Sequence, residues 1–188
     1  MRGHLRNGTA IALGTLLLCP VDVEAKEPRV FPFDVPTVFY IAKSDDRNRV
    51  DYGIHLDDHC ASMRDDAVFQ YWREFERAPP VRIHELGMFD YIPYGISEQR
   101  SVHKTATGGV HLMRLRQFKF PIEIVTEKRR DGRCGAQARV AINGKESELV
   151  YVFVQLGKSW PLPSVVYVDL HGRDLDTGYD IEQRIQVK

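Results

Sequence analysis

Apolar and polar residues alternate along most of this chain with the period of two that is typical of β-strands. The clearest example is the stretch 50–57, in which the apolar set Val50, Tyr52, Ile54 and Leu56 alternates with Asp51, Gly53, His55 and Asp57. Because successive side chains of a strand point to opposite faces, the first set is predicted to face the core and the second to face outward. The β-rich run 37–44 precedes it across the polar turn 45–48, which predicts a β-hairpin.

Strand patterns return in the C-terminal half. The alternation in 118–124 contains Pro121, which cannot donate a ladder hydrogen bond, so this strand is predicted to lie at an edge or to be bulged there. An Asn-Gly turn at Asn143 predicts a hairpin between the runs 136–142 and 148–156. Within the second run, Leu149 to Leu156 is apolar on both faces apart from Gln155, which indicates a central, covered strand. The runs 163–172 and 179–187 read as the last two strands.

The middle of the chain is less regular. The aromatic-rich stretch 67–76 predicts a third strand, although a helix also fits it, and 81–92 has the apolar spacing of a short helix. The polar stretch 93–109 reads as a long connection. The pattern therefore predicts a mainly β domain of about eight mostly antiparallel strands with one short helix, as a barrel or strongly curled sheet with the helix against one opening. A two-sheet β-sandwich is the alternative.

The first 25 residues differ from the rest. Arg2 and Arg6 precede an uncharged, mostly apolar run, 9–19, that ends at Pro20, and a small residue, Ala25, follows. This pattern is typical of a secretory signal peptide, with cleavage expected after Ala25, and the run is shorter than the ~20 residues of a membrane span. A lipoprotein signal at Cys19 is a weaker alternative, because a large residue precedes that cysteine. Residues 26–36 then form an extended, proline-rich lead-in to a single domain at 37–188.

Charge and cysteine content narrow the functional classes. The chain has 26 Lys and Arg against 26 Asp and Glu, and the signal peptide would remove two of each, so the balance stays at zero. This excludes a general electrostatic attraction to nucleic acid. After cleavage we expect no transmembrane anchor and a periplasmic or extracellular location. Two cysteines, Cys60 and Cys134, would remain, and an even pair in an oxidising compartment predicts a disulfide.

Complete catalytic and cofactor motifs are lacking, so no cofactor is predicted. His84-Glu85 begins like a zinc-protease helix, but Met88 stands where the second histidine is needed. The six residues from His55 to Cys60 are rich in metal-ligand types. A bridged cysteine is a poor ligand, so no metal site is predicted, although His55, Asp57 and His59 leave an oxygen and nitrogen site for zinc as the alternative.

Two groups of side chains are candidates for binding. Alternation places Tyr167, Asp169 and His171 on one face of a strand, where they could bind a polar ligand, or Asp169 could orient His171 for acid–base catalysis. A solvated strand face is the simpler interpretation. The aromatic residues around the predicted helix, of which Trp72 and Tyr94 are the candidates for ligand contact, could form a platform or simply part of the core.

Several stretches together resemble the bacterial family catalogued as domain of unknown function 4833. They are the hairpin 38–57, "FQYWREFE" at 69–76, "YGI" at 94–96 and the terminal run 165–185. The resemblance covers roughly 36–186 and implies an exported bacterial protein, but it brings no reaction, cofactor or catalytic residue. Two hypotheses follow. One is a non-catalytic binding or envelope-associated domain, with a small ligand or an envelope component as partner. The other is a hydrolase acting on an envelope component through Asp169 and His171.

Overall fold

The computed structural model describes residues 37–187, apart from residue 45, 76–81, 119 and 159–163. All of these residues belong to one compact unit, Phe31–Lys188. The predicted signal peptide at 1–25 and the lead-in at 26–36 lie outside the described residues. None of the helices in the described part of the chain is long and apolar enough to cross a membrane.

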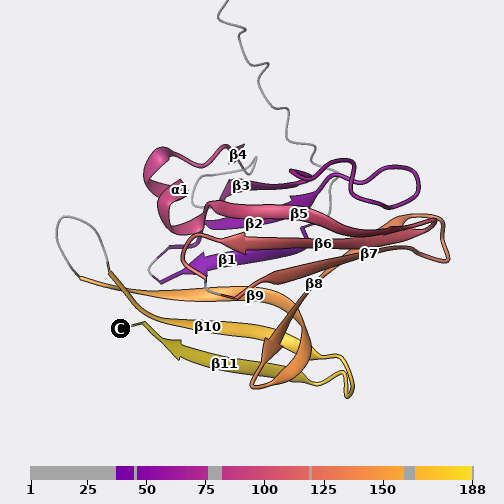
Figure 1. Cartoon of the computed structure of the whole chain (residues 1–188). Helices are drawn as coiled ribbons and strands as arrows, with labels where there is room; N and C mark the ends of the chain where they lie inside the picture. Colours follow the sequence, from indigo (N-terminus) through magenta and orange to yellow (C-terminus); the bar gives the residue numbers. More distant parts are fainter. Residues whose placement is uncertain (1–36, 45, 76–81, 119, 159–163, 188) are drawn as a thin grey trace, which may run out of the picture. The chain divides into compact units, whose positions relative to one another are not determined.

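The domain is mainly β with one short helix, as the alternation predicts (Figure 1). The elements are β1 Phe39–Lys43, β2 Arg49–Ile54, β3 Val68–Glu74, β4 Arg82–His84, α1 Met88–Tyr94, β5 Ile96–Thr105, β6 Gly108–Leu115, β7 Ile122–Lys128, β8 Cys134–Ile142, β9 Lys145–Gly157, β10 Ser164–Asp174 and β11 Asp180–Gln186. These described residues thus form eleven strands where about eight were expected, and the stretch 67–76 contains a strand and not a helix.

The long strand β9 is the branch point of the sheet. Its first residues pair with β8 and its middle residues pair in parallel with β1, while β10 pairs along almost its whole length on the opposite edge. From β9 the sheet therefore extends three ways: through β1, β2, β3 and β4; through β8, β7, β6 and β5; and through β10 to β11 (Figure 1). Every pairing except that of β1 with β9 is antiparallel.

The sheet is not closed, so a complete barrel was the wrong expectation. The ladder order in the described residues ends at β4 on one side and at β5 on the other. Side chains connect the two branches instead: the Gln99 amide of β5 accepts from Val68 N at 2.9 Å and donates to Val68 O at 3.1 Å in β3. In the same way, Ile96 N donates to Gln70 Oε1 at 3.3 Å.

The core lies between these branches and contains the residues that alternation assigned to it. Val50, Tyr52 and Ile54 of β2 are buried against apolar side chains of β6, β7 and β9. The expectation fails for the opposite face of β2, because Gly53 is buried and Asp51 is fully buried. Its neighbours on that face cover it, as described below.

The structure corrects two local predictions and confirms a third. The stretch 93–109 is not a connection, because it contains the end of α1 and the whole of β5. Pro121 directly precedes β7, which lies between β6 and β8, so the proline marks the start of an internal strand and not an edge. At the predicted hairpin turn, Asn143 and Gly144 have φ of 51° and 77°, the left-handed pair that a tight two-residue hairpin needs.

The predicted disulfide is present between Cys60 and Cys134. It joins the loop after β2 to the first residue of β8, across a sequence separation of 74 residues. The bridge therefore ties the two branches of the sheet together at the end where their loops meet.

Candidate functional site

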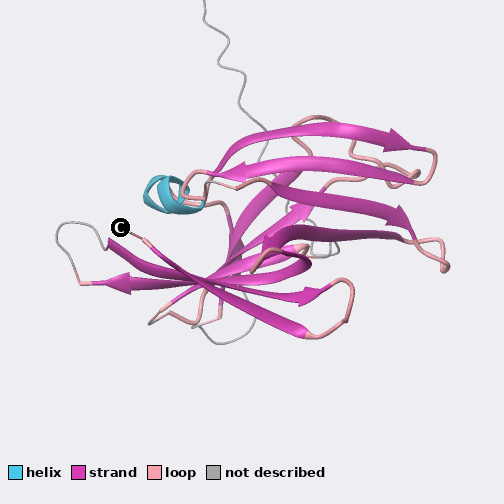
Figure 2. Ribbon diagram, turned by 60° about the horizontal axis from the view of Figure 1, so that its bottom comes forward, coloured by secondary structure: helices cyan, strands magenta, loops and turns pink. Residues whose placement is uncertain are grey.

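A cavity of about 630 Å³ lies between α1 and the last strands of the sheet. This volume is within the range of small-molecule sites and has room for on the order of 20 water molecules. In Figure 2 the helix and the end of the described chain lie at the same end of the domain, and residues of both line the cavity. The lining is mostly apolar and consists of Lys43, Phe89, Asp90, Pro93, Tyr94, Gln117, Phe118, Phe120, Val154, Leu156, Val165, Val168, Ile185, Gln186 and Val187.

The strand wall of the cavity follows from a β-bulge. The register of β10 against β9 shifts between Val165 and Tyr167. One extra residue is thereby accommodated, so Val165 and Val168 both line the cavity while Val166 between them is exposed. Simple alternation had placed Val166 on the same face as Val168 and Leu170, and the bulge is the reason that it fails there.

The helical wall is anchored to the core by one buried hydrogen bond. The hydroxyl of Tyr52, in the centre of β2, donates to the carbonyl oxygen of Tyr94 at 2.5 Å. The next residue must be a glycine, because a Cβ at Gly95 would lie 2.3 Å from the carbonyl oxygen of Tyr91. The first residues of α1 are less covered, and the Phe89 side chain is 73% exposed at the edge of the cavity.

Charged groups gather at one end of the cavity. Lys43 Nζ lies 3.0 Å from Asp46 and 4.7 Å from the centre of the Trp72 ring. Asp90 is a second acidic group and lies in the first turn of α1. Burial raises the pKa of the Tyr94 hydroxyl to about 12, and the negative charges of Asp90 and Asp46 add to this effect. Tyr94 is therefore a neutral hydroxyl beside two carboxylates at ordinary pH.

The structure separates the two aromatic residues expected to contact a ligand. Tyr94 lines the cavity. Trp72 belongs to the buried core and meets the cavity only indirectly, through Lys43 over its ring. Sequence reasoning missed Lys43 and Asp90, because nothing in their local pattern distinguishes them from other charged residues of a strand end and a helix.

Tyr167, Asp169 and His171 share one face of β10, as alternation predicts, and it is the face turned away from Val168 and the cavity. Both carboxylate oxygens of Asp169 accept from the Arg184 guanidinium of β11, each at 2.7 Å. These hydrogen bonds lower the pKa of Asp169. The same guanidinium lies 3.9 Å from the centre of the Tyr167 ring.

His171 has different neighbours. Its ring stacks on that of Tyr151 with 4.2 Å between the ring centres, and its Nδ1 lies 3.7 Å from a carboxylate oxygen of Glu182. Among the described residues, the structure shows no hydrogen bond between His171 and Asp169. One ligand atom from each of Asp169, His171 and Glu182 lies within 4.8 Å of the others, a grouping that could hold a metal ion. The Arg184 guanidinium on Asp169 would repel such an ion.

The alternative metal residues lie in the loop that carries the disulfide. Oδ1 of Asp57 accepts from the backbone amides of His59 and Ala61, each at 2.9 Å, so this carboxylate holds the turn. His55 stacks on Phe69, with 4.4 Å between the ring centres. The described residues form one group with metal-ligand spacing, and it does not include these three.

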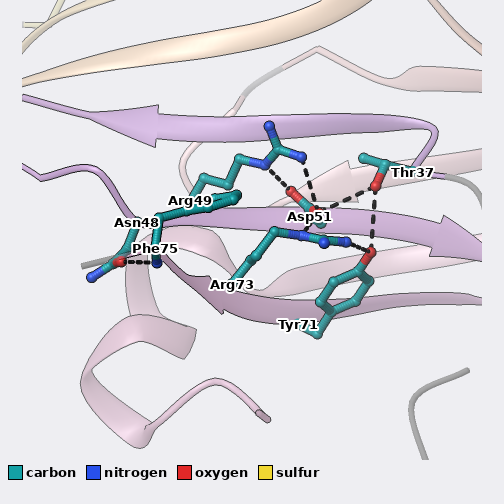
Figure 3. A network of polar contacts seen from close by, with 7 residues as sticks. All are labelled: Thr37, Asn48, Arg49, Asp51, Tyr71, Arg73 and Phe75. Carbon is teal, nitrogen blue, oxygen red and sulfur yellow. Dashed lines mark hydrogen bonds and ion pairs between the residues drawn. The ribbon is translucent and has the colours of Figure 1, made fainter. Parts of the chain in front are cut away.

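A polar network on the outer face of β1, β2 and β3 was not expected from the sequence (Figure 3). The fully buried Asp51 accepts from Nε of Arg49 and from Nε of Arg73, each at 2.6 Å, and from the Thr37 hydroxyl at 3.2 Å. Arg73 also donates to the Tyr71 hydroxyl at 2.9 Å. The signal exists only after strand pairing is known, because register brings Arg73 opposite Arg49 and Tyr71 opposite Asp51.

This face continues across six strands. Register aligns Glu182, His171, Tyr151, Tyr40, Asp51 and Tyr71 in one row from β11 to β3. The rings of Tyr40 and Tyr151 are stacked, with centres 5.2 Å apart, and Arg49 lies over the outer side of Tyr40 at 4.2 Å. Their faces are therefore covered by one another, which is unlike a platform for stacking a flat ligand.

Comparison with known proteins gives one match. A family model described as a domain of unknown function (DUF4833) matches residues 39–184, which is most of the chain. The match includes the strands β1 to β10 and the first part of β11. No curated protein and no solved structure matches the chain significantly. The chain therefore belongs to the family of the domain of unknown function 4833.

Proposed function

We propose that this protein is a non-catalytic binding domain that holds a small, largely apolar ligand in the cavity between α1 and β9, β10 and β11. The observation that carries the proposal is the cavity itself: about 630 Å³, with a mostly apolar lining and a few polar groups at one end. Concave apolar sites with a few convergent polar groups are the usual form of small-molecule sites.

Export to the bacterial periplasm or to the medium belongs to the same proposal. It is supported by the leader-like first 25 residues and by the disulfide between Cys60 and Cys134, which is stable in oxidising compartments. An apolar component of the cell envelope is then the natural ligand. N-terminal sequencing of the protein from its native host tests the export step, and we expect the mature chain to begin at Lys26.

Binding is tested with a neutral, environment-sensitive dye, N-phenyl-1-naphthylamine, displaced by straight-chain alcohols of increasing length. Each buried methylene contributes about 0.8 kcal/mol, so two more methylenes should lower the dissociation constant roughly 15-fold until the cavity is full. Val168→Trp places an indole ring in the lining of the cavity and should weaken binding, most of all for the longer chains. Val166→Trp is the matched control, because this exposed neighbour on β10 lies outside the lining. Equal binding by both variants, or no binding by the native protein, would overturn the proposal.

The second candidate, a hydrolase with His171 as base and Asp169 as its orienting carboxylate, has weaker support. The grouping of Asp169, His171 and Glu182 favours it. Against it, both oxygens of Asp169 are hydrogen-bonded to Arg184, and His171 faces Glu182. Hydrolysis of ester or amide envelope components that is lost in His171→Ala would establish this function in place of simple binding.

A further inference from the structure

The cavity has an apolar body and a charged end, and the charges at that end are unequal. Lys43 and Asp90 line it, and Asp46 lies 3.0 Å from Lys43. Among the described residues, the Asp46 carboxylate thus offsets the charge of Lys43, and the negative charge of Asp90 is left in excess. This asymmetry bears on the chemical class of the ligand, given the proposed binding function on which the inference rests.

The positive group already has partners. The Lys43 ammonium is paired with the Asp46 carboxylate and lies over the Trp72 ring, and only about a fifth of its side chain is exposed, 22%. A ligand carboxylate would have to displace Asp46 or share the ammonium with it. Lys43 is therefore a poor anchor for an anionic head group.

Asp90 has no such partner in the described part of the chain. Among the residues that the structure describes, no lysine, arginine or histidine forms an ion pair with it. The side chain is half-buried in the wall of the cavity, so its carboxylate is less screened than one in open water. Neutralisation by a bound cation or a hydrogen-bond donor would stabilise it.

The Tyr94 hydroxyl completes this end. The residue is buried, and its side chain lines the cavity. No side-chain hydrogen bond occupies it among the described residues. It stays neutral at physiological pH, so it adds a polar contact without adding charge.

We propose that the ligand is a single-chain amphiphile whose apolar tail fills the cavity and whose cationic head group, an ammonium, pairs with Asp90 beside the Tyr94 hydroxyl. A neutral alcohol of equal chain length is the second-best ligand, because it can donate one hydrogen bond to Asp90. A carboxylate of equal length is the worst, because it meets Asp90 and finds Lys43 already paired.

The test uses three ligands of one chain length, dodecylamine, dodecan-1-ol and dodecanoate, in competition with the neutral dye on the mature, oxidised protein at low salt. We expect the amine to bind about twofold to fivefold more tightly than the alcohol, the scale of a partly exposed ion pair. We expect the carboxylate to bind more weakly than the alcohol. Added salt should reduce the differences between the three.

Two variants separate the groups. Asp90→Asn should remove the preference for the amine and weaken dodecan-1-ol much less, because the asparagine oxygen can still accept a hydrogen bond from the alcohol. Glu85→Gln, which changes an exposed acid before the helix, should alter neither. Asp46→Asn should free Lys43 and improve carboxylate binding. If the alcohol binds but the preference is absent or survives Asp90→Asn, this inference is wrong and the binding function stands. If none of the three ligands binds, the binding function itself fails.

Discussion

The buried carboxylate of Asp51 gives the sharpest test of the forces in this sheet. It accepts two hydrogen bonds of 2.6 Å from the guanidinium groups of Arg49 and Arg73 (Figure 3). Replacement by asparagine keeps the size of the side chain but removes the charge and turns amide hydrogens toward groups that are themselves donors. The charge-assisted bonds are lost, and two partly buried guanidinium groups lose their counter-charge.

The magnitude follows from the exposure of the partners. A hydrogen bond to a charged group contributes about 1.5–3 kcal/mol, and two are affected. The arginine side chains retain 28% and 24% exposure, so water recovers part of this loss. We therefore expect Asp51→Asn to lower the free energy of unfolding by about 2–4 kcal/mol, which corresponds to a fall in Tm of roughly 6–12 °C.

Asp169→Asn is the matched comparison on the same face of the sheet. Asp169 is also buried and also bonded to a guanidinium, but its partner Arg184 is half exposed, 50%, so we expect a loss of about 1 kcal/mol. Urea unfolding of both variants measures the two values. An Asp51→Asn effect no larger than that of Asp169→Asn would refute the argument that burial of the arginine partners sets the strength of the network.

Three further predictions concern the disulfide, the carboxylate of Asp174 and the hydrogen bond from Tyr52 to α1. Replacing Cys60 and Cys134 with alanine should lower the free energy of unfolding by about 4.5 kcal/mol in the chain-entropy model, with the native fluorescence spectrum retained; a loss under 1 kcal/mol in urea unfolding would contradict this. The pKa of Asp174 is lowered to about 2, chiefly by the hydrogen bond that its carboxylate accepts from Lys145. The ionised carboxylate therefore stabilises the fold fully above about pH 4, and this contribution is lost as the pH falls toward about 2. Asp174→Asn should flatten that part of the profile of Tm against pH, and an unchanged profile would show that the ion pair is unimportant. Tyr52→Phe removes the buried hydrogen bond to α1 and should cost about 1–2 kcal/mol while speeding amide exchange in the helix; unchanged exchange would mean that packing alone holds it.

Local signals predicted the hairpins but not the polar strand. The hairpins at 37–57 and 136–156 combine regular alternation with turns of strong local preference, so the sequence specifies them within a few residues. Strand β5 lacks both signals. It is a largely exposed edge strand whose residues are nearly all polar, and it exists because β6 supplies a complete hydrogen-bonding edge beside it.

In the candidate site, too, features that depend on neighbouring residues were predicted, and features that depend on strand pairing were not. Alternation correctly placed Tyr167, Asp169 and His171 on one face, because that depends on neighbouring residues alone. It could not reveal that Arg184 bonds Asp169, since this contact depends on the register of β11 against β10. The cavity was even harder to predict from the sequence, because it is formed by a bulge and by segments far apart in the chain.

The cavity arises because β9 is longer than the strand beside it. Strand β1 ends at Lys43, and its pairing with β9 reaches only to Val154, whereas β9 continues to Gly157 against β10 alone. Beyond Lys43 the inner side chains of β9 and β10 have no further strand of the β1 branch to cover them, and Leu156 and Val165 line the cavity there. The helix α1 covers this region, held at its last residue by Tyr52 and free at its first turn. Because Asp90 lies on that free turn without an ion-pair partner in the described chain, it can change to suit a ligand at little cost to the fold. The head-group preference and the stability of the sheet should therefore respond to separate substitutions, Asp90 for the first and Asp51 for the second.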